Sequence, residues 1–250
     1  MPQEIEIREC TSLGDLTECV RVQREVFSLP EIELSPVRHF IVTRNAGGWA
    51  LGAWDGDRLA GFVLSVPAFL RGERAYYSHM TGVRPEYQSH GLGAKLKWAQ
   101  RTQALSEGVR YIKWTFEPVK ARNAYFNLEK LGATVAEYKV NFYGTDYGAD
   151  PDVPQKIGLA SDRLFAEWEL DSPKVEALAA GEKRHEPNEA KSRVEIPNDW
   201  LGLVANDRAA ALAEQTRVRR EFIAAFDAGL IGRSFERNAE HPAYLLYEKR

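Results

Sequence analysis

The chain has 250 residues, and its 44% hydrophobic content is ordinary for a globular protein, so it can form one large domain or a medium domain with an appendage. Its net charge of −3 and its evenly spread basic residues argue against the strongly basic face of a nucleic-acid-binding protein. The N-terminus lacks the apolar run of a signal peptide, and no stretch approaches the ~18 consecutive apolar residues of a membrane span. We therefore expect a soluble cytoplasmic protein with no nucleic-acid or membrane partner.

The chain contains two cysteines, Cys10 and Cys19. They do not form a CxxC pair, and no histidine lies nearby at the spacing of metal ligands. Two free thiols are expected in a reducing compartment, and a disulfide between them is the alternative. We expect no metal site.

The N-terminal half alternates between helical and extended patterns. Residues 4–8 (EIEIR) have the period of two that is typical of a strand, and Thr11 or Ser12 can cap the helix that follows. A second helix is expected from Ser35 to about Arg44. The further elements expected in this half are strands at 49–54 and 59–66 around a turn at 55–57, a loop at 67–73, a strand at 76–83 and a helix at 92–107 ended by Gly108.

The C-terminal half continues this pattern and then becomes more polar. The elements expected up to residue 170 are a strand at 111–116, a helix at 121–131 ended by Gly132, a strand at 134–143, a long loop at 146–161 and a strand at 163–170. Beyond it we expect a polar segment at 181–192, a short edge strand at 194–196, a long helix at 207–228 ended by Gly229 and a last strand at 244–247.

The order of these elements predicts a fold of the mixed α/β (α+β) class. The strand–helix–strand passage between residues 76 and 116 implies parallel pairing, and the hairpins imply antiparallel pairing. A mixed sheet flanked by helices satisfies both requirements. We expect a catalytic domain at 1–171 and a C-terminal αβ extension at 172–250, which holds one long helix and packs on the first domain.

Residues 83–94 (VRPEYQSHGLGA) leave a strand, turn and enter a helix. A helix N-terminus offers unpaired N–H groups and partial positive charge, and the two glycines let a phosphate approach them without interference from Cβ atoms. The segment lacks the Gly-Lys-Ser/Thr of a P-loop and the three glycines of a Rossmann fingerprint. It is therefore either a pyrophosphate seat of another kind or a glycine turn needed only for tight packing.

Two segments of the chain resemble motifs of one enzyme superfamily. Thr81 to Pro85 with the QSHGLG run at 88–93 looks like motif A of the GNAT superfamily of N-acyltransferases, and residues 123–132 (NAYFNLEKLG) resemble its motif B. The order of elements over residues 4–170 is also similar. The resemblance implies a central mixed sheet, splayed between strands 76–83 and 111–116, with the thioester of an acyl-CoA in the gap.

The resemblance also implies which residues bind the donor, acetyl-CoA or another acyl-CoA. The backbone at Thr81, Gly82 and Val83 would pair with the pantetheine amides, and Asn123 would lie near the pantetheine arm. Gln88 belongs to the motif. The N–H groups that would hold the pyrophosphate are those of Ser89, His90, Gly91, Leu92, Gly93 and Ala94.

Three side chains are candidates for catalysis. Glu117 follows strand 111–116 and is either the base or the carboxylate that binds the substrate ammonium, unless it is only an exposed strand end. His79 lies on the opposite splayed strand, either as a base or packed in the core. Many GNAT enzymes have a tyrosine acid directly before the Glu-Lys-Leu-Gly run, where this chain has Leu128. Tyr125 is the candidate substitute, or else a half-buried helix tyrosine.

Two sets of basic residues have alternative readings. One set follows the glycine turn and either contacts the 3′-phosphate of coenzyme A or forms a solvated helix face. The other lies on the long C-terminal helix and either binds a carboxylate or is surface charge. The first set is Lys95, Lys97 and Arg101, and the second is Arg217, Arg219 and Arg220.

The leading hypothesis is an acyl-CoA-dependent enzyme that N-acylates a small amine. The WTFEP run at 114–118 and the extension resemble a subgroup of bacterial GNAT proteins encoded beside N-acylamino-acid racemases. This resemblance points to amino acids as acceptors and to acetyl- or succinyl-CoA as donor. The alternatives are a coenzyme A-binding module without catalysis and a protein N-acetyltransferase. A homodimer is left open.

Overall fold

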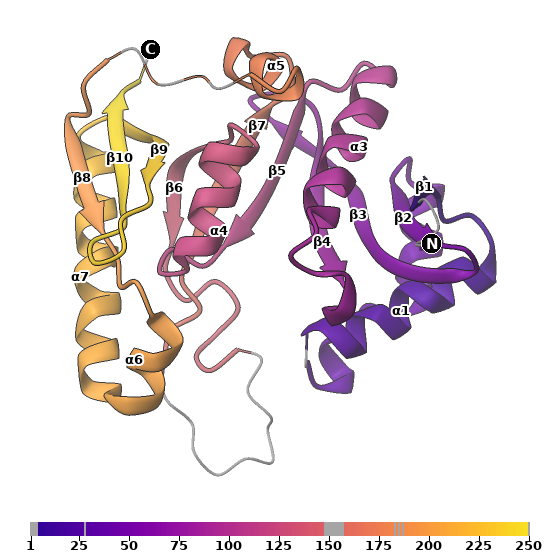
Figure 1. Cartoon of the computed structure of the whole chain (residues 1–250), viewed down its shortest axis with the longest axis horizontal. Coiled ribbons are helices and arrows are strands. Elements are labelled where there is room, and N and C mark those ends of the chain that lie inside the picture. The colour runs from indigo at the N-terminus through magenta and orange to yellow at the C-terminus, as the bar shows by residue number, and fades with distance from the viewer. Residues whose placement is uncertain are drawn as a thin grey trace. The chain divides into compact units, whose positions relative to one another are not determined.

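The computed structural model (Figure 1) describes residues 5–27, 29–147, 158–182, 184, 186 and 188–249. These residues form two compact units, one ending at Lys113 and one beginning at Trp114. Most of the loop expected at 146–161 lies outside the described residues, as do parts of the polar segment at 181–192. Within the described ranges, no helix is both long and apolar enough to cross a membrane.

The first unit is a sheet flanked by helices. Its strands follow one another in chain order, and the first four pair antiparallel. They are β1 (Glu6–Glu9), β2 (Trp49–Asp55), β3 (Arg58–Leu70), β4 (Glu73–Val83) and the start of β5 (Tyr111–Phe116). The helices are α1 (Leu13–Phe27), η1 (Glu31–Glu33), α2 (Val37–Asn45), η2 (Pro85–Tyr87) and α3 (Leu92–Ser106).

The loop expected at 67–73 is wrong, because β3 and β4 form one long hairpin that turns at Arg71-Gly72. Pro67 pairs in register with Tyr76 within this hairpin. A proline is tolerated there because the pairing of β3 with β2 ends at Ser65, so beyond it β3 needs no donor on that side. The strand expected at 76–83 accordingly begins at Glu73.

A β-bulge interrupts β4 at His79. Leu64 pairs with Met80 and Ser65 pairs with Ser78, so His79 is the extra residue of the bulge. The parallel register of β4 with β5 also stops just before it, at Tyr77 and Lys113. The parallel pairing of β4 with β5 therefore ends two residues before the bulge, and the splay implied by the resemblance stays a prediction.

The second unit contains a second set of strands and helices. Its strand order is β7-β6-β9-β10-β8, and all neighbouring pairs are antiparallel. The strands are β6 (Thr134–Lys139), β7 (Arg163–Glu169), β8 (Ser192–Glu195), β9 (Leu230–Glu236) and β10 (Ala243–Glu248). The helices are α4 (Ala121–Tyr125), the π-helix η3 (Phe126–Lys130), α5 (Pro173–Ala179), α6 (Trp200–Asn206) and α7 (Arg208–Asp227).

Several boundaries in this unit differ from expectation. The strand expected to reach 143 ends at Lys139, since turns occupy the next residues, and the expected helix at 121–131 becomes a π-helix after Tyr125. The sequence reading missed α5, α6 and β9. Helix α7 confirms the expected long helix, and it packs against β6, β8 and β9. The mixed α/β fold with helices flanking the sheet is confirmed.

Each unit has its own apolar core. In the first, α1 and α2 pack on β3 around Phe40, Phe62 and the two unbonded cysteines, whose Sγ atoms lie 3.8 Å apart. In the second, buried aromatic side chains surround the sheet, namely Trp114, Trp168, Phe222, Phe235 and Tyr244. The division at residue 171 stays a prediction.

Candidate functional site

The segment between β4 and α3 presents an uncapped helix N-terminus. Gly91 is the N-cap residue, with a φ of 78°, and no side chain caps the helix. A hydrogen bond runs from the N–H of Lys95 to the carbonyl oxygen of Gly91, at 3.1 Å. The N–H groups of Leu92, Gly93 and Ala94 therefore lie in the first turn, where a helix provides no acceptor of its own. By contrast, Asp207 caps α7 by accepting from the N–H of Ala210.

The two glycines of this turn have different reasons to be glycine. Gly91 needs its left-handed conformation, which L side chains rarely adopt. A Cβ on Gly93 would meet only Val83 Cγ2, at 3.9 Å, which is ordinary van der Waals contact. Tight packing within the protein therefore does not require glycine at 93. The open space beside the first-turn N–H groups suits a phosphate, so these residues fit the pyrophosphate of an acyl-CoA.

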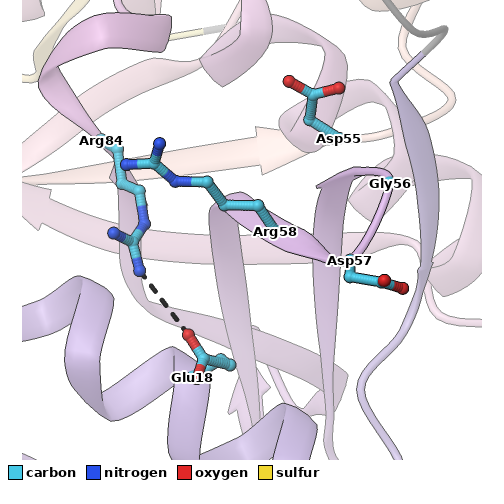
Figure 2. Close-up of a pocket in the computed structure, with 6 residues that line it drawn as sticks. All are labelled: Glu18, Asp55, Gly56, Asp57, Arg58 and Arg84. Carbon is cyan, nitrogen blue, oxygen red and sulfur yellow. Dashed lines mark ion pairs between the residues drawn. The ribbon is translucent and has the colours of Figure 1, made fainter.

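The turn is fastened at both ends. The amide of Gln88 donates to the carbonyl oxygen of Val83 at 2.8 Å, which closes the loop. Arg84 is 8% exposed and donates to Leu59 O at 2.8 Å and to Glu25 at 2.5 Å. Figure 2 shows the hollow beside it and its second ion pair, with Glu18 at 3.6 Å. These contacts fix the end of β4 against α1.

His79 lies at the bulge, and residues from the α1–α2 region contact its exposed ring. Ser35 Oγ lies 3.2 Å from its Nε2, and the ring of His39 packs edge-on at a centroid distance of 5.3 Å. Partial desolvation by the neighbouring atoms, and to a smaller extent the neighbouring His39, lower the pKa of His79. The neutral imidazole is therefore the favoured form.

Glu117, Asn123 and Tyr125 all belong to the second unit. The Glu117 carboxylate accepts from the Lys120 ammonium at 2.7 Å, and Asn123 is exposed. Tyr125 is half-buried, and its ring lies 5.6 Å from Lys130 Nζ and 5.5 Å from the guanidinium carbon of Arg237.

Leu128 is fully buried, with 0% exposure. The position where many GNAT enzymes carry a tyrosine therefore belongs to the core in this chain. A general acid has to come from elsewhere, and Tyr125 is the half-buried phenol of the same helical segment.

For Lys97, both interpretations of the basic set after the turn, a 3′-phosphate contact and a solvated helix face, are wrong. It is 3% exposed, and its Nζ lies 3.0 Å from Ser78 Oγ and 2.6 Å from Gln100 Oε1. Gln100 in turn donates to Ser65 Oγ at 2.8 Å. Burial lowers the pKa of Lys97 well below its usual range. Lys97 is therefore neither a phosphate ligand nor part of a solvated face, whereas Lys95 is exposed.

Two of the three candidate arginines on α7 make contacts within the second unit. Arg219 donates to the buried Asp162 at 2.8 and 3.1 Å. Arg217 is bonded to Glu214 and Glu221 of its own helix. Arg220 is exposed, and within the described part of the chain it makes no ion pair of this kind. Of the three, it alone fits the interpretation as surface charge.

Sequence reasoning missed the contacts that surround His79. Gln23 lies on α1, His39 lies on α2 and Ser35 lies between helices, and no local pattern links them to residue 79. The sequence offered one signal for this arrangement. Gln23 is a polar residue at a core position of α1, and a buried amide needs hydrogen-bond partners.

Comparison with known proteins agrees with the site. Residues 16–132 match the model of the acetyltransferase (GNAT) family. The match covers just under half of the chain, so these residues are similar to a GNAT acetyltransferase domain. No curated protein matches the chain.

Solved structures show the same fold. An assigned GNAT-family acetyltransferase from Desulfovibrio desulfuricans is 17% identical, with a TM-score of 0.53 over 67% of this chain and 99% of that one. The ribosomal-protein-S18-alanine N-acetyltransferase from Escherichia coli is 15% identical, with a TM-score of 0.51 over 68% and 96%. An assigned acetyltransferase from Salmonella typhimurium, solved with acetyl-CoA, is 16% identical, with a TM-score of 0.51 over 67% and 95%.

Proposed function

We propose that this protein transfers an acyl group, acetyl or succinyl, from coenzyme A to the amine of a small molecule such as an amino acid. The observation that carries the proposal is the uncapped N-terminus of α3, with open space at Gly93. It directly follows strand β4, which contains a bulge at His79. Such a turn suits a pyrophosphate, and the strand before it suits an extended amide chain.

In this proposal, the donor lies along the end of β4. The N–H groups from Ser89 to Ala94 hold the pyrophosphate, and the backbone of Thr81, Gly82 and Val83 pairs with the pantetheine amides. The N–H of Val83 polarises the thioester carbonyl. Asn123 and the exposed Lys95 remain candidates for contacts with the donor.

His79 is the base in this proposal. Its imidazole is solvent-accessible and favoured in the neutral form, so it can accept a proton at neutral pH. Glu117 is assigned to binding the substrate ammonium, since its carboxylate already accepts from the ammonium of Lys120.

Tyr125 is the general acid in this proposal. The amine nitrogen forms a bond to the acyl carbon while the carbon–sulfur bond breaks, and the thiolate takes the Tyr125 hydroxyl proton. Lys130 and Arg237 lie close to the ring. The tyrosinate then regains a proton from water.

Two alternatives follow from particular observations. The buried Leu128 would suit a coenzyme A-binding module without turnover. The likeness in fold to the ribosomal-protein-S18-alanine N-acetyltransferase is the reason to consider a protein acceptor. The amino-acid acceptor, the cytoplasmic location and a homodimer are all predictions.

The test is thiol release from acetyl-CoA and succinyl-CoA against a panel of L- and D-amino acids. Turnover with any pair supports the proposal and identifies the donor. Coenzyme A binding measured by calorimetry without turnover would favour the module or a protein acceptor. Without binding, the proposal fails.

A further inference from the structure

The ring of His79 is held on one side by a serine whose backbone is itself fixed by a buried amide. Gln23 on α1 is 1% exposed. Its amide nitrogen donates to the carbonyl oxygen of Ser35 at 3.1 Å, and its amide oxygen accepts from the Ser35 N–H at 3.0 Å. Both polar groups of the Ser35 backbone are thus paired with a single buried side chain. Ser35 is fixed relative to α1 although it lies between helices.

The residue that follows stiffens this position further. Pro36 is the N-cap of α2 with a φ of −72°, so the chain direction after Ser35 is set by a proline ring. Three residues into the same segment, His39 packs edge-on against the ring of His79. Burial lowers the pKa of His39 too, which favours a neutral neighbour beside His79.

The hydroxyl of Ser35 meets one specific ring nitrogen. Its Oγ lies 3.2 Å from Nε2 of His79, and among the described residues no hydrogen bond is made to Nδ1. A serine hydroxyl can accept from a protonated Nε2 or donate to its lone pair. When the hydroxyl accepts, the lone pair of the neutral ring lies on Nδ1. Because His79 is the extra residue of the β4 bulge, the strand geometry re-aims this side chain.

We propose that Ser35 is a positioning residue for His79, accepting the Nε2–H so that the lone pair of Nδ1 is left to take the proton of the attacking amine. The assignment rests on the proposed function, and Gln23 supports it by holding Ser35. In the step itself the amine N–H bond breaks and an Nδ1–H bond forms. The imidazolium keeps its Nε2–H bond to Ser35 and then releases the proton from Nδ1 to water.

The tautomer can be measured without turnover. Long-range ¹H–¹⁵N spectra of the full chain report which ring nitrogen of each histidine is protonated, and loss of a signal in His79→Gln assigns the resonance. We expect the Nε2–H form in the wild type and a mixture in Ser35→Ala. Ser106→Ala is the matched control, because it removes an exposed serine hydroxyl at the end of α3.

The kinetic arm separates positioning from folding. Ser35→Ala should lower kcat roughly 10–100-fold, the size usual for residues that orient a reacting group, with KM for acyl-CoA changed less than about twofold. Ser35→Thr keeps a hydroxyl and should restore both kcat and the tautomer. Gln23→Leu should resemble Ser35→Ala.

An unchanged His79 tautomer in Ser35→Ala would overturn the assignment, and so would full activity in that variant. Absence of turnover with every donor and acceptor would count against the proposed function, whereas the NMR comparison would still decide the role of Ser35.

Discussion

The hydroxyl of Tyr244 on β10 donates to the carbonyl oxygen of Pro118 at 2.7 Å, across 126 positions of sequence. Pro118 directly follows Glu117, so the C-terminal strand fastens the segment that carries this candidate carboxylate. Glu129 makes a second link of this kind, accepting from the hydroxyl of Ser234 and from the N–H of Phe235 at 2.7 Å. The C-terminal extension therefore supports the segments that hold Glu117 and Tyr125.

Tyr244→Phe should destabilise the protein by about 1–3 kcal/mol, because the buried carbonyl of Pro118 loses its partner. Urea unfolding measures the change. Tyr87→Phe is the control, since its bond to Asp55 lies at a half-buried site that water can reach, and it should cost about 0.5 kcal/mol or less. Equal losses in both variants would contradict the support assigned to Tyr244.

Gly93→Asp should weaken coenzyme A binding by about tenfold or more, because it places a carboxylate beside N–H groups that would otherwise hold phosphate. Gly91→Asp should do the same but also strains the left-handed backbone. The matched control is Gly14→Asp, in the first turn of α1, where a Cβ meets only Ser12 Oγ at 3.6 Å. Calorimetry on the folded variants measures the affinity. Unchanged affinity in Gly93→Asp would remove the pyrophosphate assignment.

His79→Gln should lower kcat by about 10²–10⁴-fold, the usual loss when a general base is removed. Glu117→Gln should mainly raise KM for the amine, because the variant loses the charge that attracts an ammonium. Neither change should alter donor affinity by much. Steady-state kinetics with both substrates varied separates the two roles. If Glu117→Gln reduced kcat and His79→Gln did not, the two assignments would have to be exchanged.

Lys97 should make stability depend on pH on the alkaline side. Its pKa is lowered in the folded state, so the unfolded chain binds more protons at neutral pH, and folding becomes more favourable as pH rises toward the unfolded pKa of about 10.4. Lys97→Met removes this term. The variant should therefore be most stable relative to the wild type near pH 7 and lose that advantage toward pH 10. Urea unfolding at pH 7, 8.5 and 10 checks this, and a constant difference would refute it.

Local patterns in the sequence predicted much of the fold. The strand and helix that frame residues 83–94 were predicted because the periodicity and the glycines are local signals. The hairpin at 67–73 was missed because Pro67 reads as a breaker unless one knows that β2 has already ended. Strand β9 was missed because its partners, β6 and β10, lie far away in sequence.

The sequence likewise predicted the local features of the site but not its long-range contacts. The turn at Gly91 and Gly93 is a local feature, whereas the surroundings of each charged side chain depend on distant segments. Lys97 was read as exposed because its neighbours on α3 are polar, yet it faces Ser78 of β4. The contact of His79 with Ser35 spans 44 positions, so no local sequence pattern could predict it.

The central claim is that the turn before α3 binds the pyrophosphate of coenzyme A, and calorimetric titration of acetyl-CoA tests it most directly. Wild-type protein and Gly14→Asp should bind one equivalent with similar affinity, and Gly93→Asp should bind more weakly by about tenfold or more. Binding that is absent from the wild type, or equally strong in all three proteins, would contradict the account.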